Sequence, residues 1–369
     1  MTGTAPFRIL IAVLLAPCCV WAQTSVKDIA GAWRGEFTIQ DTIKVPFNFE
    51  IDESGKVILL NADERFQSGT VTIKKDSLFI PLDQFDNELA LRIHKNGELS
   101  GRLEKQNQAG LNVPLTPRKG TPRFKKKTPP AKDISGSYVV EILLSNGKKE
   151  KSVAIFKQDG AKLTGTFLKQ SGDARYLEGT VNGNRFYLSS FIGSTPGYYE
   201  GTVTPTGEIS GFQAGTKIRY PFSRKYDPTA EPGDPFTLSH LKPGYSSLSF
   251  SLPDIDGNKM SLHDKKFRNK AVIIAITGTW CPNCIDEAAF LAPWYKKNKD
   301  RGVEIITIHY ERQTDTAFAH KVMRRFRNRF DIEYTQLFGG YATGDSVRAT
   351  LPALASFRAF PTTLFIGKD

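Results

Sequence analysis

The spacing of hydrophobic residues divides the chain into two regions. Up to residue 226, short runs of alternating apolar and polar residues are separated by Gly, Asp, Asn and Ser, as in antiparallel strands joined by tight turns. The runs include VPFNFEI, TVTIKKDSLFIPL and ELALRI, and later VVEILL, SVAIF and RFYLSSF. This pattern predicts an all-β region, an antiparallel meander that forms barrels or sandwiches.

An internal repeat subdivides the all-β region. DIAGAW (28–33) returns as DISGSY (133–138), GTV (69–71) as GTV (179–181), and GELSG (97–101) as GEISG (207–211). Recurrence in the same order predicts tandem copies of one unit, which we place at 23–117 (β repeat 1) and 133–226 (β repeat 2). Trp33 and Tyr138 begin equivalent strands, where we expect core aromatics.

Proline-rich segments follow each repeat. PRKGTPRFKKKTPPAK, residues 117–132, contains seven basic residues, four prolines and no acidic residue. This composition predicts a solvated, self-repelling linker at 118–132, whose charge could also contact an anionic envelope surface. A second segment rich in Pro and Gly predicts a linker at 227–247.

From residue 248 the pattern predicts alternating strands and helices. AVIIAI (271–276) and VEIITI (303–308) are continuous apolar runs that suit strands covered on both faces. Helices are predicted at 282–299 and 315–330, and a third strand is predicted at 362–366. In the second helix an apolar residue recurs at every fourth position, and the arginines are expected to face solvent: the former are Phe318, Val322, Phe326 and Phe330, and the latter Arg324, Arg325, Arg327 and Arg329. The order predicts an α/β layer domain at 248–369.

The first 22 residues read as a targeting segment. Arg8 precedes the apolar run ILIAVLLAPCCVWA, which is typical of a secretory signal peptide. The run is shorter than the roughly 18 residues that a membrane span needs, so we predict no transmembrane span. Cys18 follows Leu15-Ala16-Pro17, a loose match to a lipoprotein site that leaves lipidation open. We therefore expect secretion across the inner membrane, to the periplasm or the envelope.

Charge and cysteine content narrow the range of possible functions. The net charge of +12 is not accompanied by the interleaved aromatic and basic pattern of a nucleic-acid reader, so no nucleic-acid partner is expected. After loss of the signal peptide only Cys281 and Cys284 remain. Structural disulfides of secreted proteins usually come in several pairs of cysteines that are distant in sequence. Two neighbouring cysteines therefore indicate a reactive pair more than a structural disulfide.

The two cysteines lie in WCPNC (280–284), between a predicted strand and a predicted helix. Pro282 suits the first residue of a helix, so the Cys281 sulfur should meet free N–H groups and the positive end of the helix dipole, which stabilise a thiolate. Cys284 follows about one turn later, where it could resolve a mixed disulfide. A redox centre is the favoured interpretation, and an inert bridge stays open.

Other uses of the cysteine pair fit less well. Haem attachment requires a histidine directly after the second cysteine, but Ile285 occupies that position. Structural zinc requires four ligands, and the five histidines provide no second pair at fitting spacing. We therefore predict no metal and no cofactor. His309 ends a predicted strand and could approach the thiols, although a structural role is favoured.

Residues from about 248 to the end resemble a thioredoxin-fold domain of the TlpA-like group of secreted or envelope thiol-disulfide oxidoreductases. The resemblance rests on WCPNC and on a lead-in pattern, made by Phe250, Leu252, Asp254, Gly257, Ser261 and Leu262. It implies that Cys281 and Cys284 form a redox disulfide, and that Glu287 is a carboxylate near the thiols that influences proton transfer. An acidic residue in the first helical turns could instead only complement the helix dipole.

The resemblance also implies a substrate-binding edge beside the disulfide. Pro361 is expected to be a cis-proline, and the residue before it, Phe360, to pair its backbone with a bound substrate peptide; a trans proline at a strand edge is the alternative. Trp280 is expected to contact the substrate as well. Protein thiols or disulfides and an upstream electron donor are the implied partners.

This sequence departs from the family pattern at three places. Proline comes first between the cysteines, where the family usually has it second. Ala289 occupies the position of a helix-kinking proline, with Pro293 one turn later. The chain ends at Asp369, before the last strand and helix of such a fold, so we expect the domain to be incomplete.

The predicted function is a secreted or envelope disulfide reductase acting on protein partners. Two alternatives stay open. A thiol peroxidase shares the fold, but its lead-in would place proline at Ile274 and threonine at Gly278. An envelope binding or scaffold protein would use the β repeats to recognise a ligand.

Overall fold

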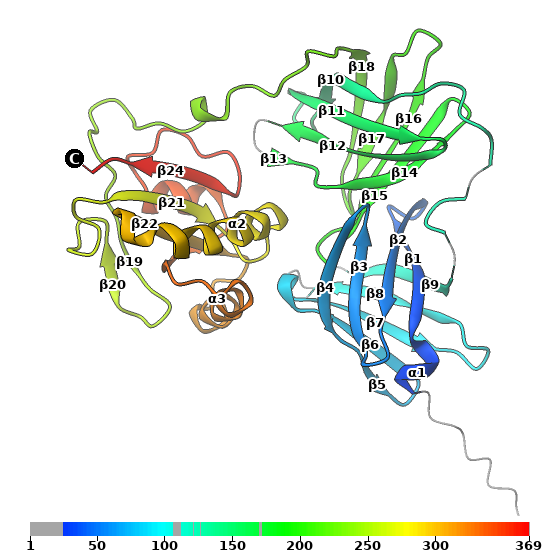
Figure 1. Cartoon of the computed structure of the whole chain (residues 1–369), viewed down its shortest axis with the longest axis horizontal. Coiled ribbons are helices and arrows are strands. Elements are labelled where there is room, and N and C mark those ends of the chain that lie inside the picture. Colours follow the sequence, from blue (N-terminus) through cyan, green and yellow to red (C-terminus); the bar gives the residue numbers. More distant parts are fainter. Residues whose placement is uncertain (1–24, 106–111, 121, 126, 170–171, 369) are drawn as a thin grey trace, which may run out of the picture.

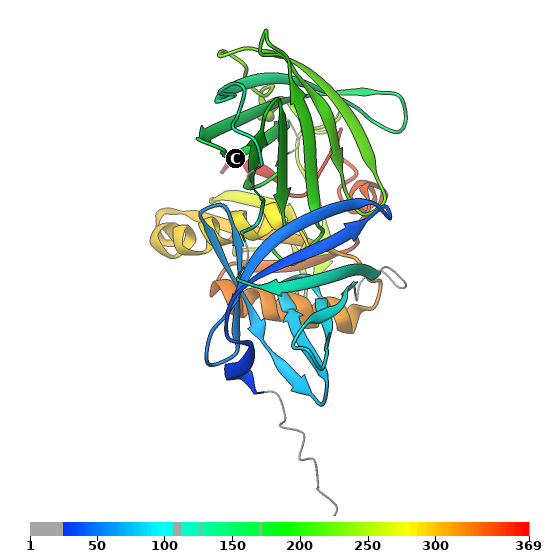
Figure 2. The same cartoon turned by 90° about the vertical axis from the view of Figure 1, so that its right-hand side faces the viewer.

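The computed structural model describes residues 25–368 except 106–111, 121, 126 and 170–171 (Figure 1). The predicted signal peptide (1–22) lies outside the described residues. Figures 1 and 2 show two β units, one above the other, and an α/β domain beside them. The predicted all-β region and α/β layer domain are both present.

The first β unit begins with a short helix, α1 (Val26–Ile29). Within the described residues it forms a nine-stranded sheet in the order β4-β3-β2-β1-β9-β8-β7-β6-β5, in which neighbouring strands run antiparallel. A 3-10 turn, η1 (Asp83–Phe85), links β6 to β7. The strands are β1 (Gly31–Ile39), β2 (Ile43–Ile51), β3 (Lys56–Asn61), β4 (Glu64–Thr70), β5 (Thr72–Lys74), β6 (Ser77–Leu82), β7 (Asn87–Ile93), β8 (Leu99–Lys105) and β9 (Asn112–Lys119).

The second β unit also forms a nine-stranded sheet in the described residues, in the order β11-β10-β18-β17-β16-β15-β14-β12-β13. An additional pairing of β11 with β12 closes the sheet on itself, so that it is barrel-like. The strands are β10 (Gly136–Leu143), β11 (Lys149–Asp159), β12 (Lys162–Lys169), β13 (Gly172–Asp173), β14 (Leu177–Asn182), β15 (Arg185–Ser190), β16 (Gly197–Val203), β17 (Ile209–Ala214) and β18 (Arg219–Tyr226).

The same local contact recurs at the start of both β units. The Trp33 indole N–H donates to the carbonyl oxygen of Ile29 at 2.8 Å. The Tyr138 hydroxyl donates to the carbonyl oxygen of Ile134 at 3.1 Å. Both aromatic side chains are buried, which confirms that they are core residues. Their polar atoms reach a backbone acceptor four residues earlier, so burial leaves neither of them unpaired.

The C-terminal domain is built on a four-stranded sheet in the order β23-β22-β21-β24. Strand β22 runs parallel to β21 and β23, and β24 runs antiparallel to β21. After η2 (Pro235–Thr237) and the hairpin β19 (Ser251–Pro253) and β20 (Lys259–Ser261), strands and helices alternate. They are β21 (Ala271–Thr277), α2 (Pro282–Asn298), η3 (Lys299–Arg301), β22 (Val303–Glu311), α3 (Thr316–Phe330), β23 (Thr335–Tyr341), α4 (Gly344–Thr350) and β24 (Thr362–Ile366).

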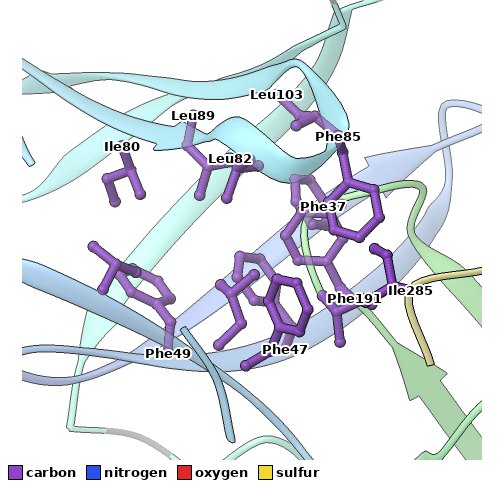
Figure 3. Close-up of a cluster of buried hydrophobic side chains, with 14 of the residues drawn as sticks. Phe37, Phe47, Phe49, Ile80, Leu82, Phe85, Leu89, Leu103, Phe191 and Ile285 are labelled. Carbon is purple, nitrogen blue, oxygen red and sulfur yellow. The ribbon is translucent and has the colours of Figure 1, made fainter. Parts of the chain in front are cut away.

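One continuous hydrophobic cluster joins the three units. Phe191, which follows β15 of the second β unit, packs edge-on against Phe37 and Phe47 of the first, with 4.7 Å between the ring centroids in each pair. Ile285 and Tyr295 of α2 belong to the same cluster. Figure 3 shows Ile285 beside Phe191. The helix that carries the cysteines is therefore packed against the β units.

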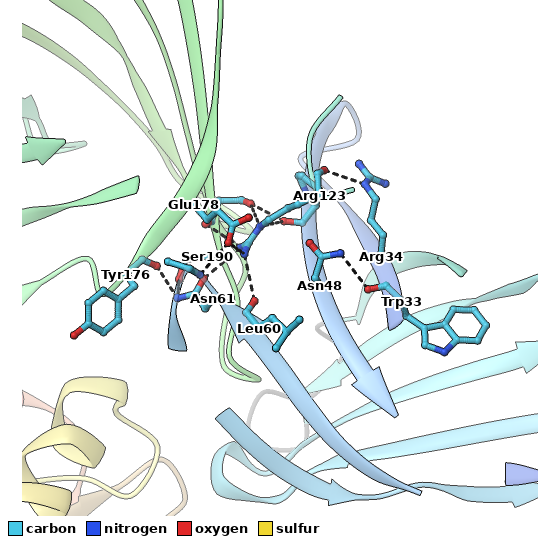
Figure 4. A network of polar contacts seen from close by, with 12 residues as sticks. Trp33, Arg34, Asn48, Leu60, Asn61, Arg123, Tyr176, Glu178 and Ser190 are labelled. Carbon is cyan, nitrogen blue, oxygen red and sulfur yellow. Dashed lines mark hydrogen bonds and ion pairs between the residues drawn. The ribbon is translucent and has the colours of Figure 1, made fainter. Parts of the chain in front are cut away.

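The segment predicted as a linker contributes a buried residue to this junction. Arg123 is 4% exposed and donates hydrogen bonds to three carbonyl oxygens, those of Pro46, Leu60 and Ser189, and to the Asn61 side chain (Figure 4). A buried guanidinium requires such acceptors, because its charge leaves water. At this position the expectation of a solvated tether is wrong.

Arg325 of α3 also differs from expectation, whereas Arg324 and Arg329 are exposed as predicted. Arg325 forms an ion pair with Asp86 of the first β unit at 2.7 Å. Arg329 lies over the Phe66 ring at 4.7 Å. Arg325 is thus half-buried, because α3 packs at an interface that a helical pattern within one segment does not reveal, whereas Arg329 contacts the first β unit and stays exposed, as expected.

Candidate functional site

The cysteine motif stands where β21 passes into α2. Cys281 is the N-cap residue of α2 and Pro282 is its first helical residue. Both cysteines are unbridged thiols, with exposed fractions of 5% for Cys281 and 1% for Cys284. The structure therefore places Cys281 at the helix N-terminus, as the sequence pattern predicts.

The surroundings separate the pKa values of the two thiols. A hydrogen bond from the Cys284 side chain lowers the pKa of Cys281, and the backbone N–H groups of Cys284 and Asn283 add to the effect, while burial and the charge of Glu287 oppose it. Burial raises the pKa of Cys284 well above its usual value. Cys281 is thus the thiol that ionises first, with Cys284 as its hydrogen-bond donor.

The loop before β24 meets the Cys281 sulfur. The Phe360–Pro361 peptide bond is cis, and the Cys281 thiol donates to the carbonyl oxygen of Phe360 at 3.4 Å. The Phe360 ring packs edge-on against Trp280, with 5.4 Å between the centroids. Trp280 is fixed by its indole N–H, which donates to the carbonyl oxygen of Tyr310 at 2.9 Å. These predicted site residues therefore lie around one sulfur atom.

Glu287 lies one turn after Cys284 on α2. Its carboxylate accepts a hydrogen bond from the Thr363 hydroxyl of β24. Burial raises the pKa of Glu287, and the Thr363 hydrogen bond partly opposes that shift. Its charge also acts on Cys281. A carboxyl group with a raised pKa, in electrostatic range of Cys281, is suited to accept and return a proton.

The β repeats reach the motif through polar contacts that local sequence patterns do not indicate. The Gln84 side chain of η1 donates to the carbonyl oxygen of Thr279 at 3.1 Å. Arg175, between β13 and β14, donates to the carbonyl oxygen of Pro282 at 3.3 Å. Each partner is distant in the chain, so no spacing rule connects them.

Arg312 is a further residue that sequence reasoning missed. Its guanidinium lies over the Trp280 ring at 4.0 Å, in electrostatic range of Cys281. It directly follows β22, at the carboxyl end of a strand that runs parallel to its neighbours, where sites of α/β sheets usually lie. That position is the signal that could have identified it.

His309 does not join the cysteines in the structure. It is fully buried, with its Nε2 atom 3.1 Å from the Thr307 hydroxyl and 3.1 Å from the Gln336 amide. Its ring packs edge-on against Phe326. These contacts agree with the structural role favoured for it.

A groove of about 1040 Å³ lies beside the cysteine motif. Asn283 and Pro361, which flank Cys281, are among its lining residues, and it continues along β24 past Phe365. Cys281 itself is nearly covered and is not among the residues that line the groove. Among the described residues, no group of three or more His, Cys, Asp and Glu side chains could hold a metal ion. None of the described helices is both long and apolar enough to cross a membrane.

Comparison with known proteins bears on this domain. Residues 243–369 match the model of the AhpC/TSA family. The C-terminal domain is 28% identical over 133 residues to a thiol-disulfide oxidoreductase ResA of Bacillus cereus. It is 32% identical over 126 residues to ResA of Bacillus thuringiensis subsp. konkukian. The C-terminal part of the chain is therefore similar to oxidoreductases of the thioredoxin fold.

These matches cover part of each protein. Both ResA alignments cover 34% of this chain and 64% of the relative. A solved thiol-disulfide oxidoreductase from Bacteroides fragilis NCTC 9343 is 17% identical, with a TM-score of 0.27 over 32% of this chain and 81% of that one. A thiol:disulfide interchange protein of the thioredoxin family from Chlorobium tepidum TLS is 23% identical, with a TM-score of 0.27 over 34% and 79%. The family match and the ResA alignments confirm the predicted resemblance of the C-terminal domain.

Proposed function

We propose that the protein is a thiol-disulfide oxidoreductase that reduces disulfides of protein partners through Cys281 and Cys284. The observation that carries the proposal is the position of Cys281 at the N-terminus of α2, one turn before Cys284, whose side chain lowers the pKa of Cys281. Such an arrangement provides a nucleophile and a resolving thiol, which reversible disulfide exchange requires. The ResA relatives carry the same activity in their names.

The exchange proceeds in two balanced steps. The Cys281 thiolate attacks one sulfur of the partner disulfide: a bond forms between the two sulfurs, the partner S–S bond breaks, and the leaving thiolate takes up a proton. Cys284 then loses its proton to Glu287 and attacks the Cys281 sulfur. The mixed disulfide breaks, the second partner thiolate is released and protonated, and Cys281–Cys284 remains as a disulfide. The partner has gained two electrons, which a dithiol donor must return to the enzyme.

We assign substrate contact to Trp280 and Phe360, the aromatic residues around Cys281. Trp280 and Phe360 pack against each other beside the sulfur, and the groove next to Pro361 can accept an extended chain. The function is placed in the envelope or periplasm on the basis of the apolar run after Arg8. The β repeats orient the domain, with residues 118–132 and 227–247 as the connecting segments.

Turnover of a protein disulfide tests the proposal. The full chain, reduced with dithiothreitol, should accelerate the reduction of insulin disulfides, and Cys281→Ser should remove the acceleration. Equal rates for the parent and Cys281→Ser would refute the proposal. Rapid consumption of hydrogen peroxide that depends on Cys281, without disulfide reduction, would favour the thiol peroxidase alternative instead.

A further inference from the structure

A second cavity, of about 580 Å³, lies where the two β units meet the segment that connects them. Its walls come from β1, β2 and β9 of the first unit and from β14, β15 and β16 of the second. The connecting segment adds residues 122–125 and Lys127. Figure 4 shows Arg34 and Arg123 at this junction. A cavity of this size can enclose most of a small molecule.

The lining of this cavity is strongly basic. Six of its fifteen described lining residues are Lys or Arg, and Glu36 is the one acidic residue among them. Glu36 is already paired with Arg34 at 2.7 Å, and Glu178 lies 3.7 Å from Arg123. The other four cations have no ion pair with an acidic side chain of the described residues: Lys44, Arg118, Lys125 and Lys127. Protein groups therefore leave positive charge in the cavity unbalanced.

The register of the first sheet places two of these cations against each other. Arg34 of β1 and Arg118 of β9 are directly opposite residues of neighbouring antiparallel strands. Like charges in such a pair repel and destabilise the sheet. Glu36 compensates Arg34, but the Arg118 side chain has no hydrogen bond or ion pair among the described residues. A bound anion relieves this repulsion, which gives the arginine pair a role in binding one.

The connecting segment is attached to both β units beside the cavity, which keeps its cations in place. The Nε atom of Arg34 donates to the carbonyl oxygen of Arg123 at 3.0 Å. The backbone N–H of Lys127 donates to the Asn182 side chain at 3.1 Å. Lys125 lies between these two contacts and lines the cavity. Cations that are already in place lose little conformational entropy when an anion binds to them.

The uncharged part of the lining suits the body of a sugar. Phe124, Tyr187 and Tyr198 supply aromatic surface, which can pack against the C–H face of a sugar ring. Thr116 and Asn182 supply a hydroxyl and an amide, groups that exchange hydrogen bonds with sugar hydroxyls. A flat anionic membrane surface could not reach such side chains inside a cavity. The chemistry of the cavity thus favours a small anionic sugar.

We propose that this cavity is a binding site for a small sugar that carries at least two phosphate or carboxylate groups. Arg118 of the first β unit and Lys125 of the connecting segment bind its anionic groups, the arginine through two parallel N–H donors. The sugar ring lies against the aromatic residues of the cavity. The site belongs to the β units and not to the C-terminal domain, so the inference goes beyond the proposed function and does not depend on it.

Calorimetric titration of the full chain in about 0.15 M salt, where unspecific attraction is screened, tests the proposal. Two probes separate the possible groups: fructose 1,6-bisphosphate for phosphate and digalacturonic acid for carboxylate. At least one of them should bind at a single site, and equal binding of uncharged fructose would overturn the proposal. In Arg118→Met/Lys125→Met the dissociation constant of the bound probe should rise about tenfold or more, because two charge-assisted hydrogen bonds are lost.

The matched control is Lys148→Met/Lys157→Met, which removes two exposed lysines of the second β unit that do not line the cavity. It lowers the net charge by the same amount and should leave the dissociation constant unchanged. An equal rise in both double variants would mean that overall charge attracts the probe, which overturns the proposal. All four substituted side chains are exposed, so both variants should keep the parental unfolding temperature.

Acetylation of lysines, read by mass spectrometry, locates the bound probe. A saturating concentration of probe should slow the acetylation of Lys44, Lys125 and Lys127 and leave that of Lys148 unchanged. Binding without this protection overturns the proposal, and so does the failure of both probes to bind. Binding of the chain to phosphatidylglycerol vesicles, with no binding of either soluble probe, also overturns it and would assign these cations to a membrane surface.

Discussion

The Thr363 hydroxyl donates a hydrogen bond to the Glu287 carboxylate, and this contact joins the helix of the cysteines to the strand that follows Pro361. It holds the carboxyl group in a fixed place beside the thiols. Burial raises the pKa of Glu287 and the Thr363 hydrogen bond lowers it, so the two effects together set the pH at which Glu287 would act as the proposed base.

Glu287→Gln should affect the two steps of exchange in opposite directions. The charge of Glu287 raises the pKa of Cys281, so its loss should increase the thiolate fraction and speed the first attack at low pH. Loss of the base should slow resolution by Cys284 about 100-fold. Stopped-flow measurement of mixed-disulfide formation and decay would separate the steps, and unchanged decay would contradict the role of Glu287.

Thr363→Val is the milder companion variant. It keeps the carboxyl group but removes its hydrogen-bond donor, so the pKa of Glu287 should rise further. The carboxylate form is then lost at a higher pH, and the pH profile of the decay step should move upward. Identical profiles for Thr363→Val and the parent would mean that the contact does not tune Glu287.

Arg123→Met should weaken the junction between the β repeats. It leaves the carbonyl oxygen of Leu60 and the Asn61 side chain without this donor, and each unpaired buried acceptor costs about 1 to 3 kcal/mol. We expect a lower unfolding temperature and faster proteolysis within 118–132. Arg118→Met, at an exposed position of β9, is the control, and equal behaviour of the two variants would contradict this account.

Lys105→Met should stabilise the protein at neutral pH. Burial, with the positive charges of Arg312 and Lys217, lowers the pKa of Lys105 from 10.5 to about 8. Keeping Lys105 charged in the folded state therefore lowers the free energy of unfolding by up to about 3 kcal/mol. The hydrogen bond from Lys105 to the Thr195 hydroxyl at 2.7 Å offsets about 1 kcal/mol of this cost.

Because the pKa of Lys105 is lowered in the folded state, the stabilisation by Lys105→Met depends on pH. The cost is fully present below pH 8, where Lys105 is charged in both states, and it disappears as the pH rises towards 10.5. The gain in unfolding temperature for Lys105→Met should therefore shrink between those values. The exposed Lys157→Met is the control, and a pH-independent gain, or none at pH 7, would contradict the shift.

Local sequence patterns predicted the elements that carry the site. The predicted helices at 282–299 and 315–330 correspond to α2 (Pro282–Asn298) and α3 (Thr316–Phe330). The run AVIIAI lies within β21. The start, end and type of such an element depend on the periodic spacing of its apolar residues and on residues such as Pro282, which suit one position in a helix. The sequence of a single segment is therefore enough to predict it.

Contacts between the units could not be predicted in the same way. Arg175 meets Asp286, and Phe191 packs into the core of the first β unit, although in each case the partners are more than 100 residues apart in sequence. A buried arginine and an exposed one look alike in sequence, as Arg123 and Arg118 do. Only the folded arrangement reveals which of them has backbone acceptors within reach.

The central claim is that Cys281 attacks and Cys284 resolves, and trapping the intermediate tests it most directly. Cys284→Ser, reduced and then mixed with an excess of a peptide that contains one disulfide, should accumulate a covalent adduct at Cys281, read by mass spectrometry as one peptide per chain. Cys281→Ser should accumulate none, because the pKa of the remaining thiol is raised well above its usual value and its side chain is almost fully covered. An adduct of equal yield in both variants, or none in Cys284→Ser, would contradict the account.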